Sequence, residues 1–202
     1  MIEPEKQPDF SLPALRAGNR EEFARLVDFY SGPIYRLALK MLDDPQDAEE
    51  ALQETFIKAF RHLATFEGRS SLSTWLYRIA VNEALMLIRQ RRPDMLSTDE
   101  DVKTQEGELE PLQIVDWHDL PEEELLSSEL QSVLDQAILR LPETLRVVFL
   151  LRDVQSLSVR ETAEALSLSE TAVKTRLLRA RLRLRDYLST YFKERIKANQ
   201  KD

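Results

Sequence analysis

Residues 158–188 read SVRETAEALSLSETAVKTRLLRARLRLRDYL. The first part has the apolar period of a short helix, a polar break ends at Ser169, and a second helix starts near Glu170. This second helix carries six basic residues between Lys174 and Arg185 and no acidic one. A short helix, a tight turn and a basic helix are the arrangement that inserts side chains into the major groove of DNA. The stretch therefore predicts a helix-turn-helix, with a solvated basic surface helix as the open alternative.

The second helix has an apolar face and a basic face. Its core stripe is predicted at Val173, Leu177, Ala180 and Leu184. The candidate DNA-contacting residues lie early in the helix, where base contacts are usually made. They are Thr171, Lys174, Thr175, Arg176 and Arg179. The cations that flank this face, Arg176, Arg179, Arg181 and Arg183, suit phosphates or guanine edges. Cations at helical spacing repel one another, which favours DNA contact over a merely solvated face.

The composition of the whole chain predicts an all-α protein. Its 202 residues include only 4 Gly and 9 Pro, and apolar residues make up 43%. There is no cysteine, which excludes disulfides, a thiol nucleophile and Cys-based metal sites. The first residues lack the layout of a signal peptide, and no run of about 18 apolar residues occurs. We therefore expect a cytoplasmic protein without membrane insertion.

Charge is distributed unevenly along this acidic chain, whose formal net charge is −8. Residues 1–92 are nearly neutral, with 13 basic and 14 acidic side chains. Residues 93–138 carry 1 basic and 14 acidic side chains, and residues 139–202 carry 14 and 8. The basic end is therefore a local feature, as expected of a DNA-binding segment.

The periodicity divides the chain into four parts. Residues 1–19 form an N-terminal tail, and 20–92 are helical, with breaks predicted at Gly32-Pro33 and at 43–45. Residues 93–128 form an acidic linker without a sustained period, and 129–196 are helical again. The fold prediction is two small helical domains, an N-terminal helical bundle and a C-terminal helix-turn-helix, joined by a flexible acidic linker.

The loop FEGRSS at 66–71 precedes a helix predicted at 73–92. Trp75, Arg78 and Asn82 fall at i, i+3 and i+7, so they share one face of this helix. An aromatic ring, an amide and a cation on one face suit stacking and hydrogen bonding to unpaired bases. Spacing alone leaves the alternative open, in which the aromatic side chains are ordinary core residues.

The helix from Asp47 carries a polar face opposite an apolar one. The polar candidates are Asp47, Glu50, Gln53, Glu54 and Lys58. The apolar face is predicted to include Phe56, Ala59 and Phe60. A hydrolytic acid pair needs two isolated carboxyl groups in a cleft, so this surface is solvated or binds a protein. Since the histidines stand alone and no glycine belongs to a phosphate-binding loop, we predict no catalytic residue, no metal and no cofactor.

Two long stretches resemble a known family. DAEEALQETFIKAFRHLATFEGRSSLSTWLYRIAVNEALMLIRQRR at 47–92 resembles the second conserved region of bacterial sigma-70 family transcription initiation factors. LPETLRVVFLLRDVQSLSVRETAEALSLSETAVKTRLLRARLRLRDYL at 141–188 resembles their fourth region. The short spacer without a third region resembles the layout of the extracytoplasmic-function (ECF) subfamily.

The resemblance implies three contact surfaces. The polar face of the 47–58 helix would dock on a coiled coil of the largest RNA polymerase subunits. The 66–71 loop and the helix after it would capture a flipped base of the −10 promoter element. The residues implied there are Phe66, Arg69, Ser70, Trp75, Arg78 and Asn82. The five early residues of the basic helix, Thr171 to Arg179 as named above, would read the −35 element. Lys174-Thr175 stands where many relatives have an Arg-Ser pair, and Lys lacks the bidentate fork of Arg. The base sequence of the preferred −35 element therefore stays open.

The sequence therefore predicts an ECF-type sigma factor, which is not an enzyme and directs core RNA polymerase to promoters. Its expected partners are core RNA polymerase, promoter DNA and an anti-sigma factor. The acidic linker would thread the polymerase channel and would repel DNA from the free protein. A stand-alone helix-turn-helix regulator, which would bind its operator without polymerase, is the alternative.

Overall fold

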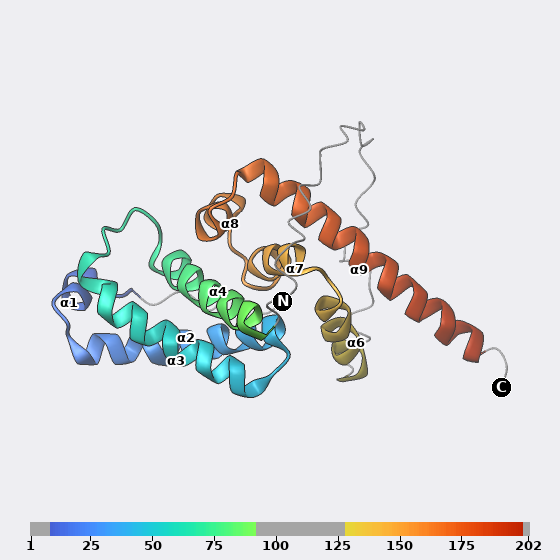
Figure 1. Cartoon of the computed structure of the whole chain (residues 1–202), viewed down its shortest axis with the longest axis horizontal. Helices are drawn as coiled ribbons and strands as arrows, with labels where there is room; N and C mark the ends of the chain where they lie inside the picture. Colours follow the sequence, from blue (N-terminus) through green and yellow to red (C-terminus); the bar gives the residue numbers. More distant parts are fainter. Residues whose placement is uncertain (1–8, 92–127, 200–202) are drawn as a thin grey trace.

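The computed structural model describes residues 9–91 and 128–199, and all regular structure in these two ranges is helical (Figure 1). The first range contains α1 (Leu12–Arg16), α2 (Arg20–Leu42), α3 (Pro45–His62), the short turn η1 (Leu63–Thr65) and α4 (Leu72–Arg91). The second contains α6 (Ser128–Leu139), α7 (Glu143–Phe149), a π-helical turn η4 (Leu150–Val154), α8 (Val159–Leu166) and α9 (Glu170–Asn199). The all-α prediction is confirmed, whereas residues 92–127, which hold most of the acidic linker, lie outside the described ranges.

Polar caps define where α2 and α3 begin. The Asn19 side chain accepts a hydrogen bond from the Glu22 amide at 2.9 Å, and the Asp44 side chain accepts one from the Asp47 amide at 3.0 Å. Such caps satisfy amides that no helical carbonyl can reach. Asp43 ends α2 in the left-handed conformation with φ 56°. The break predicted at 43–45 is therefore confirmed.

The break predicted at Gly32-Pro33 is wrong, because α2 continues through Pro33. A proline inside a helix removes one hydrogen bond and costs about 3 kcal/mol. Tyr30, three residues before the proline, and Ile34, directly after it, are 3% and 0% exposed. Burying a large apolar side chain contributes roughly 1.5–3 kcal/mol, so packing of this segment offsets the cost of the proline.

The predicted N-terminal tail contains α1 in its described part. The Ser11 amide donates to Glu22 Oε1 at 2.7 Å, which ties the start of α1 to α2. Leu15 is only 1% exposed, and the rings of Phe10 and Phe29 lie 6.0 Å apart. Because α1 buries apolar side chains against its neighbours, it is part of the N-terminal bundle.

α8 and α9 form the predicted helix-turn-helix. A reciprocal capping box starts α8: the Glu161 amide donates to Ser158 Oγ at 3.1 Å, and the Ser158 amide donates to Glu161 Oε2 at 2.8 Å. Ser167 ends α8 in the left-handed conformation. The Ser169 hydroxyl then accepts from the Ala172 amide at 3.1 Å and caps α9. Short polar side chains therefore define this turn.

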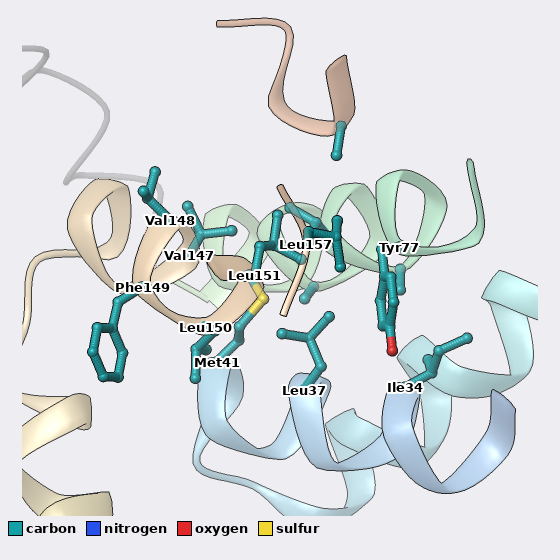
Figure 2. Close-up of a cluster of buried hydrophobic side chains, with 14 of the residues drawn as sticks. Ile34, Leu37, Met41, Tyr77, Val147, Val148, Phe149, Leu150, Leu151 and Leu157 are labelled. Carbon is teal, nitrogen blue, oxygen red and sulfur yellow. The ribbon is translucent and has the colours of Figure 1, made fainter. Parts of the chain in front are cut away.

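The two groups of helices share one hydrophobic core. Figure 2 shows Leu37 and Met41 of α2 beside Leu150 and Leu151 of η4. Leu150 and Leu151 are both 0% exposed. The sequence predicts two helical units but not that they pack against each other.

Candidate nucleic-acid and partner interfaces

α9 separates a buried face from an exposed one, as its periodicity predicts. The predicted core residues are all buried: Val173, Leu177, Ala180 and Leu184. Three of the five predicted DNA contacts are exposed: Thr171, Lys174 and Arg179. The other two, Thr175 and Arg176, are half-buried. All five lie within roughly the first three turns of α9, so the structure brings them together at the end that a helix-turn-helix presents to DNA.

Arg181 does not belong to this basic surface. Its guanidinium makes two hydrogen bonds to the Asp153 carboxylate, at 2.9 and 2.8 Å. The hydrogen bonds to Asp153 also raise the pKa of Arg181 above its usual value. A bidentate pair of this kind is among the stronger polar contacts in proteins. The prediction that Arg181 suits a phosphate is therefore replaced by a structural role, in which it fastens α9 to η4.

The 66–71 loop is built on an aromatic pair. The Phe66 ring is 7% exposed and lies 4.9 Å from the ring of Trp75, which is half-buried. Because the Phe66 ring is buried, it cannot contact DNA as predicted. It supports Trp75 instead. Arg69 is exposed but pairs with Glu67, and Ser70 is half-buried.

Beyond the loop, α4 presents an open polar face. Arg78 and Asn82 are both exposed and lie one turn apart. Met86, one turn further on, is 39% exposed. Within residues 9–91 and 128–199, neither side chain makes an ion pair or a side-chain hydrogen bond, so both are available to a ligand. An amide and a guanidinium at this spacing can hydrogen-bond a base edge and a phosphate.

The polar face of α3 is smaller than predicted. Glu50 and Gln53 are exposed and Glu54 is half-buried. Asp47 is only 7% exposed, and its carboxylate lies 2.5 Å from Arg91 of α4. The prediction that Asp47 lies on the outer face is wrong, because α4 runs alongside α3 and covers it.

Lys58 is likewise turned toward α4. Its ammonium lies 2.5 Å from Glu83, whose side chain is 6% exposed. The Lys58 side chain is still 36% exposed, but its charge is paired within the bundle and is less available to a partner than predicted. Two ion pairs, Lys58–Glu83 and Asp47–Arg91, instead join α3 to α4.

Sequence reasoning missed an apolar extension of the outer face of α3. Ile57 and Phe60 are 41% and 47% exposed. Phe60 was expected in the core, but its ring lies edge-on 5.0 Å from Phe23 at the surface. The helical spacing indicates this extension, since Ile57 and Phe60 follow the exposed Gln53 at i+4 and i+7 and so share its face. The open face of α3 is therefore acidic at its start and apolar toward its end.

The Lys58–Glu83 pair predicts an unequal response to its two single substitutions. Lys58→Met leaves a buried carboxylate unpaired and should lower the free energy of unfolding by about 2–4 kcal/mol. Glu83→Gln leaves Lys58 unpaired, but this side chain is 36% exposed and its ammonium can be hydrated, so the change should cost about 1 kcal/mol. Urea denaturation of the two variants measures the difference. Arg160→Met, which removes the exposed pair with Glu164, is the control. Equal effects of Lys58→Met and Glu83→Gln would contradict the prediction.

Two other features are absent from the described ranges. No group of three or more His, Cys, Asp or Glu side chains in residues 9–91 and 128–199 is arranged to hold a metal ion. Among the helices in these ranges, none is both long and apolar enough to span a bilayer.

Comparisons with known proteins match two separate stretches of the chain to two family models. Residues 26–93 match the family model of sigma-70 region 2, and residues 131–184 match that of sigma-70 region 4. The chain is 38% identical over 174 residues to the ECF RNA polymerase sigma factor SigW of Bacillus subtilis. The aligned residues cover 86% of this chain and 92% of SigW. The chain is 36% identical over 170 residues to the RNA polymerase sigma-H factor of Pseudomonas aeruginosa, covering 83% and 86%.

Two solved structures have a similar fold. CnrH in complex with the cytosolic domain of CnrY has a TM-score of 0.64 at 24% identity, covering 89% of this chain and 95% of that one. The sigma factor RpoE in complex with the anti-sigma factor NepR from Bartonella quintana has a TM-score of 0.62 at 23% identity, covering 84% and 98%. The arrangement of helices found here therefore recurs in both.

Proposed function

The chain belongs to the sigma-70 family, in its ECF subfamily, and from this premise we propose how its surfaces divide the work of a sigma factor. It directs RNA polymerase to promoters. The observation that carries the detailed proposal is the presence of two separate polar surfaces, one on α4 and one on α9. They occur in the two segments that match regions 2 and 4.

We assign promoter reading to two modules. Residues 20–92 act as region 2, residues 129–196 act as region 4, and 93–128 connect them. Thr171, Lys174 and Arg179 contact the −35 duplex in the major groove, with Thr175 and Arg176 at the edge of the same surface. The module at the −35 element fixes where polymerase binds, because its contacts are made to intact duplex.

The α4 surface acts on unpaired DNA of the −10 element. Trp75 stacks on the strand, Asn82 hydrogen-bonds a flipped base, and Arg78, Arg69 and Ser70 bind the backbone nearby. Phe66 supports Trp75 from below. Unstacking a base costs only a few kcal/mol, so a small number of such contacts makes local melting favourable.

The outer face of α3 binds core polymerase. Glu50, Gln53 and Glu54 supply its polar part, and Ile57 and Phe60 supply an apolar part that becomes buried on docking. Asp47 and Lys58 act indirectly, because they fix α3 against α4. An exposed apolar cluster with a polar rim is the composition expected of a protein-binding surface.

The chain has no reaction of its own in this proposal; polymerase supplies the active site, and the protein works in the cytoplasm, where polymerase is. We also propose an anti-sigma factor as a regulatory partner. RpoE was solved with the anti-sigma factor NepR, and CnrH with the cytosolic domain of CnrY.

The decisive experiment compares promoter binding by the protein with and without core polymerase. We expect a gel shift and a transcript only when core polymerase is present. Gln53→Lys combined with Ile57→Lys should abolish both, because it places two cations on the proposed polymerase-binding face. Gln131→Lys combined with Thr190→Lys, at exposed positions elsewhere, makes the same charge change and should have no effect. Tight, specific binding by the free protein would instead favour the stand-alone regulator.

A further inference from the structure

The short helix α1 lies beside the loop that the proposed function assigns to the −10 strand. It packs against η1, the turn that leads into the 66–71 loop (Figure 1). Leu15 of α1 and Leu63 of η1 are 1% and 2% exposed and belong to the same core cluster. The Ser11 amide, which donates to the Glu22 carboxylate, fixes the other end of α1. α1 is therefore held in a defined position next to the loop.

Arg16, the last residue of α1, reaches the middle of this loop. A Cβ atom added to Gly68 would lie 3.8 Å from Arg16 Nη2. Gly68 has φ 76°, a conformation that residues with a side chain rarely adopt. Because glycine leaves the backbone uncovered at this point, a bound strand can approach the loop and the Arg16 guanidinium together.

The charge of Arg16 has no partner within residues 9–91 and 128–199. Its side chain is exposed, and it makes no ion pair or side-chain hydrogen bond there. Arg69, the cation of the loop itself, is paired with Glu67. These two opposite charges largely cancel in their effect on a polyanion, whereas the charge of Arg16 is not compensated. Arg16 therefore supplies an unpaired positive charge at the loop.

The position of Arg16 also lies close to the aromatic side chain on which the strand is proposed to stack. The ring of Trp75 packs 4.9 Å from the ring of Phe66, which begins the loop. Gly68 is two residues further on, so its Cα atom lies at most about 7 Å from that of Phe66. A strand stacked on Trp75 has one phosphate for every nucleotide, and the neighbouring phosphates extend over the loop toward Arg16. Arginine suits such a phosphate because its planar guanidinium can donate two hydrogen bonds to it.

We propose that Arg16 binds a backbone phosphate of the unpaired −10 strand, which makes α1 part of the strand-binding surface. The proposal rests on the proposed function, because the strand is the one assigned above to the α4 surface. Arg16 lies outside residues 26–93, the stretch that matches region 2. Since a phosphate contact carries no sequence information, Arg16 stabilises the separated strand whatever its bases are, and Asn82 reads the flipped base.

The first measurement is the affinity of holoenzyme for a fluorescent single-stranded oligonucleotide. The oligonucleotide carries the −10 sequence of a promoter that the holoenzyme transcribes. Arg16→Ala should weaken binding about twofold to tenfold, and by the same factor when the bases are changed. The slope of log affinity against log salt should become shallower by about 0.7, the value for one phosphate of a single strand. Arg16→Lys, which keeps the charge, should retain most of the affinity.

Arg140→Ala is the matched control for this measurement. Arg140 is also exposed and makes no ion pair or side-chain hydrogen bond within the two described ranges, but it lies between α6 and α7. The control should bind the strand like the wild type. An equal loss in Arg16→Ala and Arg140→Ala would overturn the proposal, because it would reflect net charge and not a contact.

A neutral linkage in the DNA separates a phosphate contact from a structural role of Arg16. Each oligonucleotide of a series carries one methylphosphonate in place of a phosphate and is titrated with wild-type and Arg16→Ala holoenzyme. At the contacted phosphate only the wild type should lose affinity, so that the two proteins bind equally there. Losses of the same size in both proteins at every position would overturn the proposal. Wild-type affinity of Arg16→Ala for the unmodified strand would also overturn it.

Two further readouts separate this proposal from polymerase binding and from the proposed function. Arg16→Ala should bind core polymerase like the wild type, and weaker binding would place Arg16 in the polymerase interface and overturn the proposal. Arg78→Ala with Asn82→Ala should weaken strand binding while Arg16 is intact. If that variant bound the strand like the wild type, the proposed α4 surface would fail. If it bound weakly and Arg16→Ala had no effect, the assignment of Arg16 alone would fail.

Discussion

Replacing Lys174 and Arg179 together by glutamate is expected to reduce transcription from a promoter that depends on its −35 element by at least roughly 30-fold. Each lost base or phosphate contact costs about 1–3 kcal/mol, and every 1.4 kcal/mol is a factor of ten in binding. The two new carboxylates add repulsion from the DNA backbone. Both side chains are exposed, and the core stripe of α9 is untouched, so the fold should be retained.

The measurement is the yield of transcript, in parallel with the affinity of holoenzyme for promoter fragments at several salt concentrations. Arg20→Glu combined with Arg140→Glu is the matched control, because it makes the same change in net charge at exposed positions outside α9. The salt dependence of promoter binding should become weaker in the α9 variant only, since fewer phosphates are neutralised. An equal loss of transcription in both variants would mean that net charge matters and that α9 does not read the −35 element.

The helices could be predicted because their signals are local. The apolar stripe of α9 and the capping box of Ser158 and Glu161 each involve residues within one or two turns of one another. The wrong prediction at Pro33 has the opposite origin. A local rule predicted a break, and the burial of Tyr30 and Ile34 overrode it. The sequence pattern of a single helix does not show how that helix packs against its neighbours.

The polar faces were harder to predict than the apolar ones. Asp47, Lys58 and Arg181 all carry charges suited to a partner, yet each is paired with a residue of another helix or turn. A charged residue at a helical surface position has the same sequence signature whether it meets solvent, DNA or a neighbouring helix. Periodicity identifies which side chains share a face but not what covers that face.

The packing of the two modules against each other could not be predicted for a related reason. Leu37 and Leu151 are both apolar residues in apolar stripes, and each stripe could be buried within its own module. Their contact joins residues far apart in the sequence, and no local pattern specifies such a pairing. The sequence therefore predicted two candidate DNA-reading surfaces, whereas the structure showed that the modules that carry them pack against each other.

Arg78→Ala combined with Asn82→Ala is expected to impair promoter melting by roughly 10- to 100-fold while leaving capture of the closed promoter nearly unchanged. Hydrogen bonds to a base edge contribute about 1–3 kcal/mol, and those to the flipped base form only after the strand has separated. Both side chains are exposed on α4, so their removal leaves no cavity. Trp75 is a less informative target, because its ring also packs on Phe66.

A fluorescent base analogue at the flipped position of the −10 element reports melting, and a gel shift of holoenzyme on duplex DNA reports capture. Arg140→Ala with Gln90→Ala is the matched control, since it removes the same two functional groups from exposed positions away from the loop. The separation of the two readouts is the essential result, because the proposed function assigns duplex contacts to α9 and strand contacts to α4. If capture and melting fell together in the α4 variant, this face would contribute to duplex binding or to the fold. The assignment of base capture to Asn82 would then be wrong.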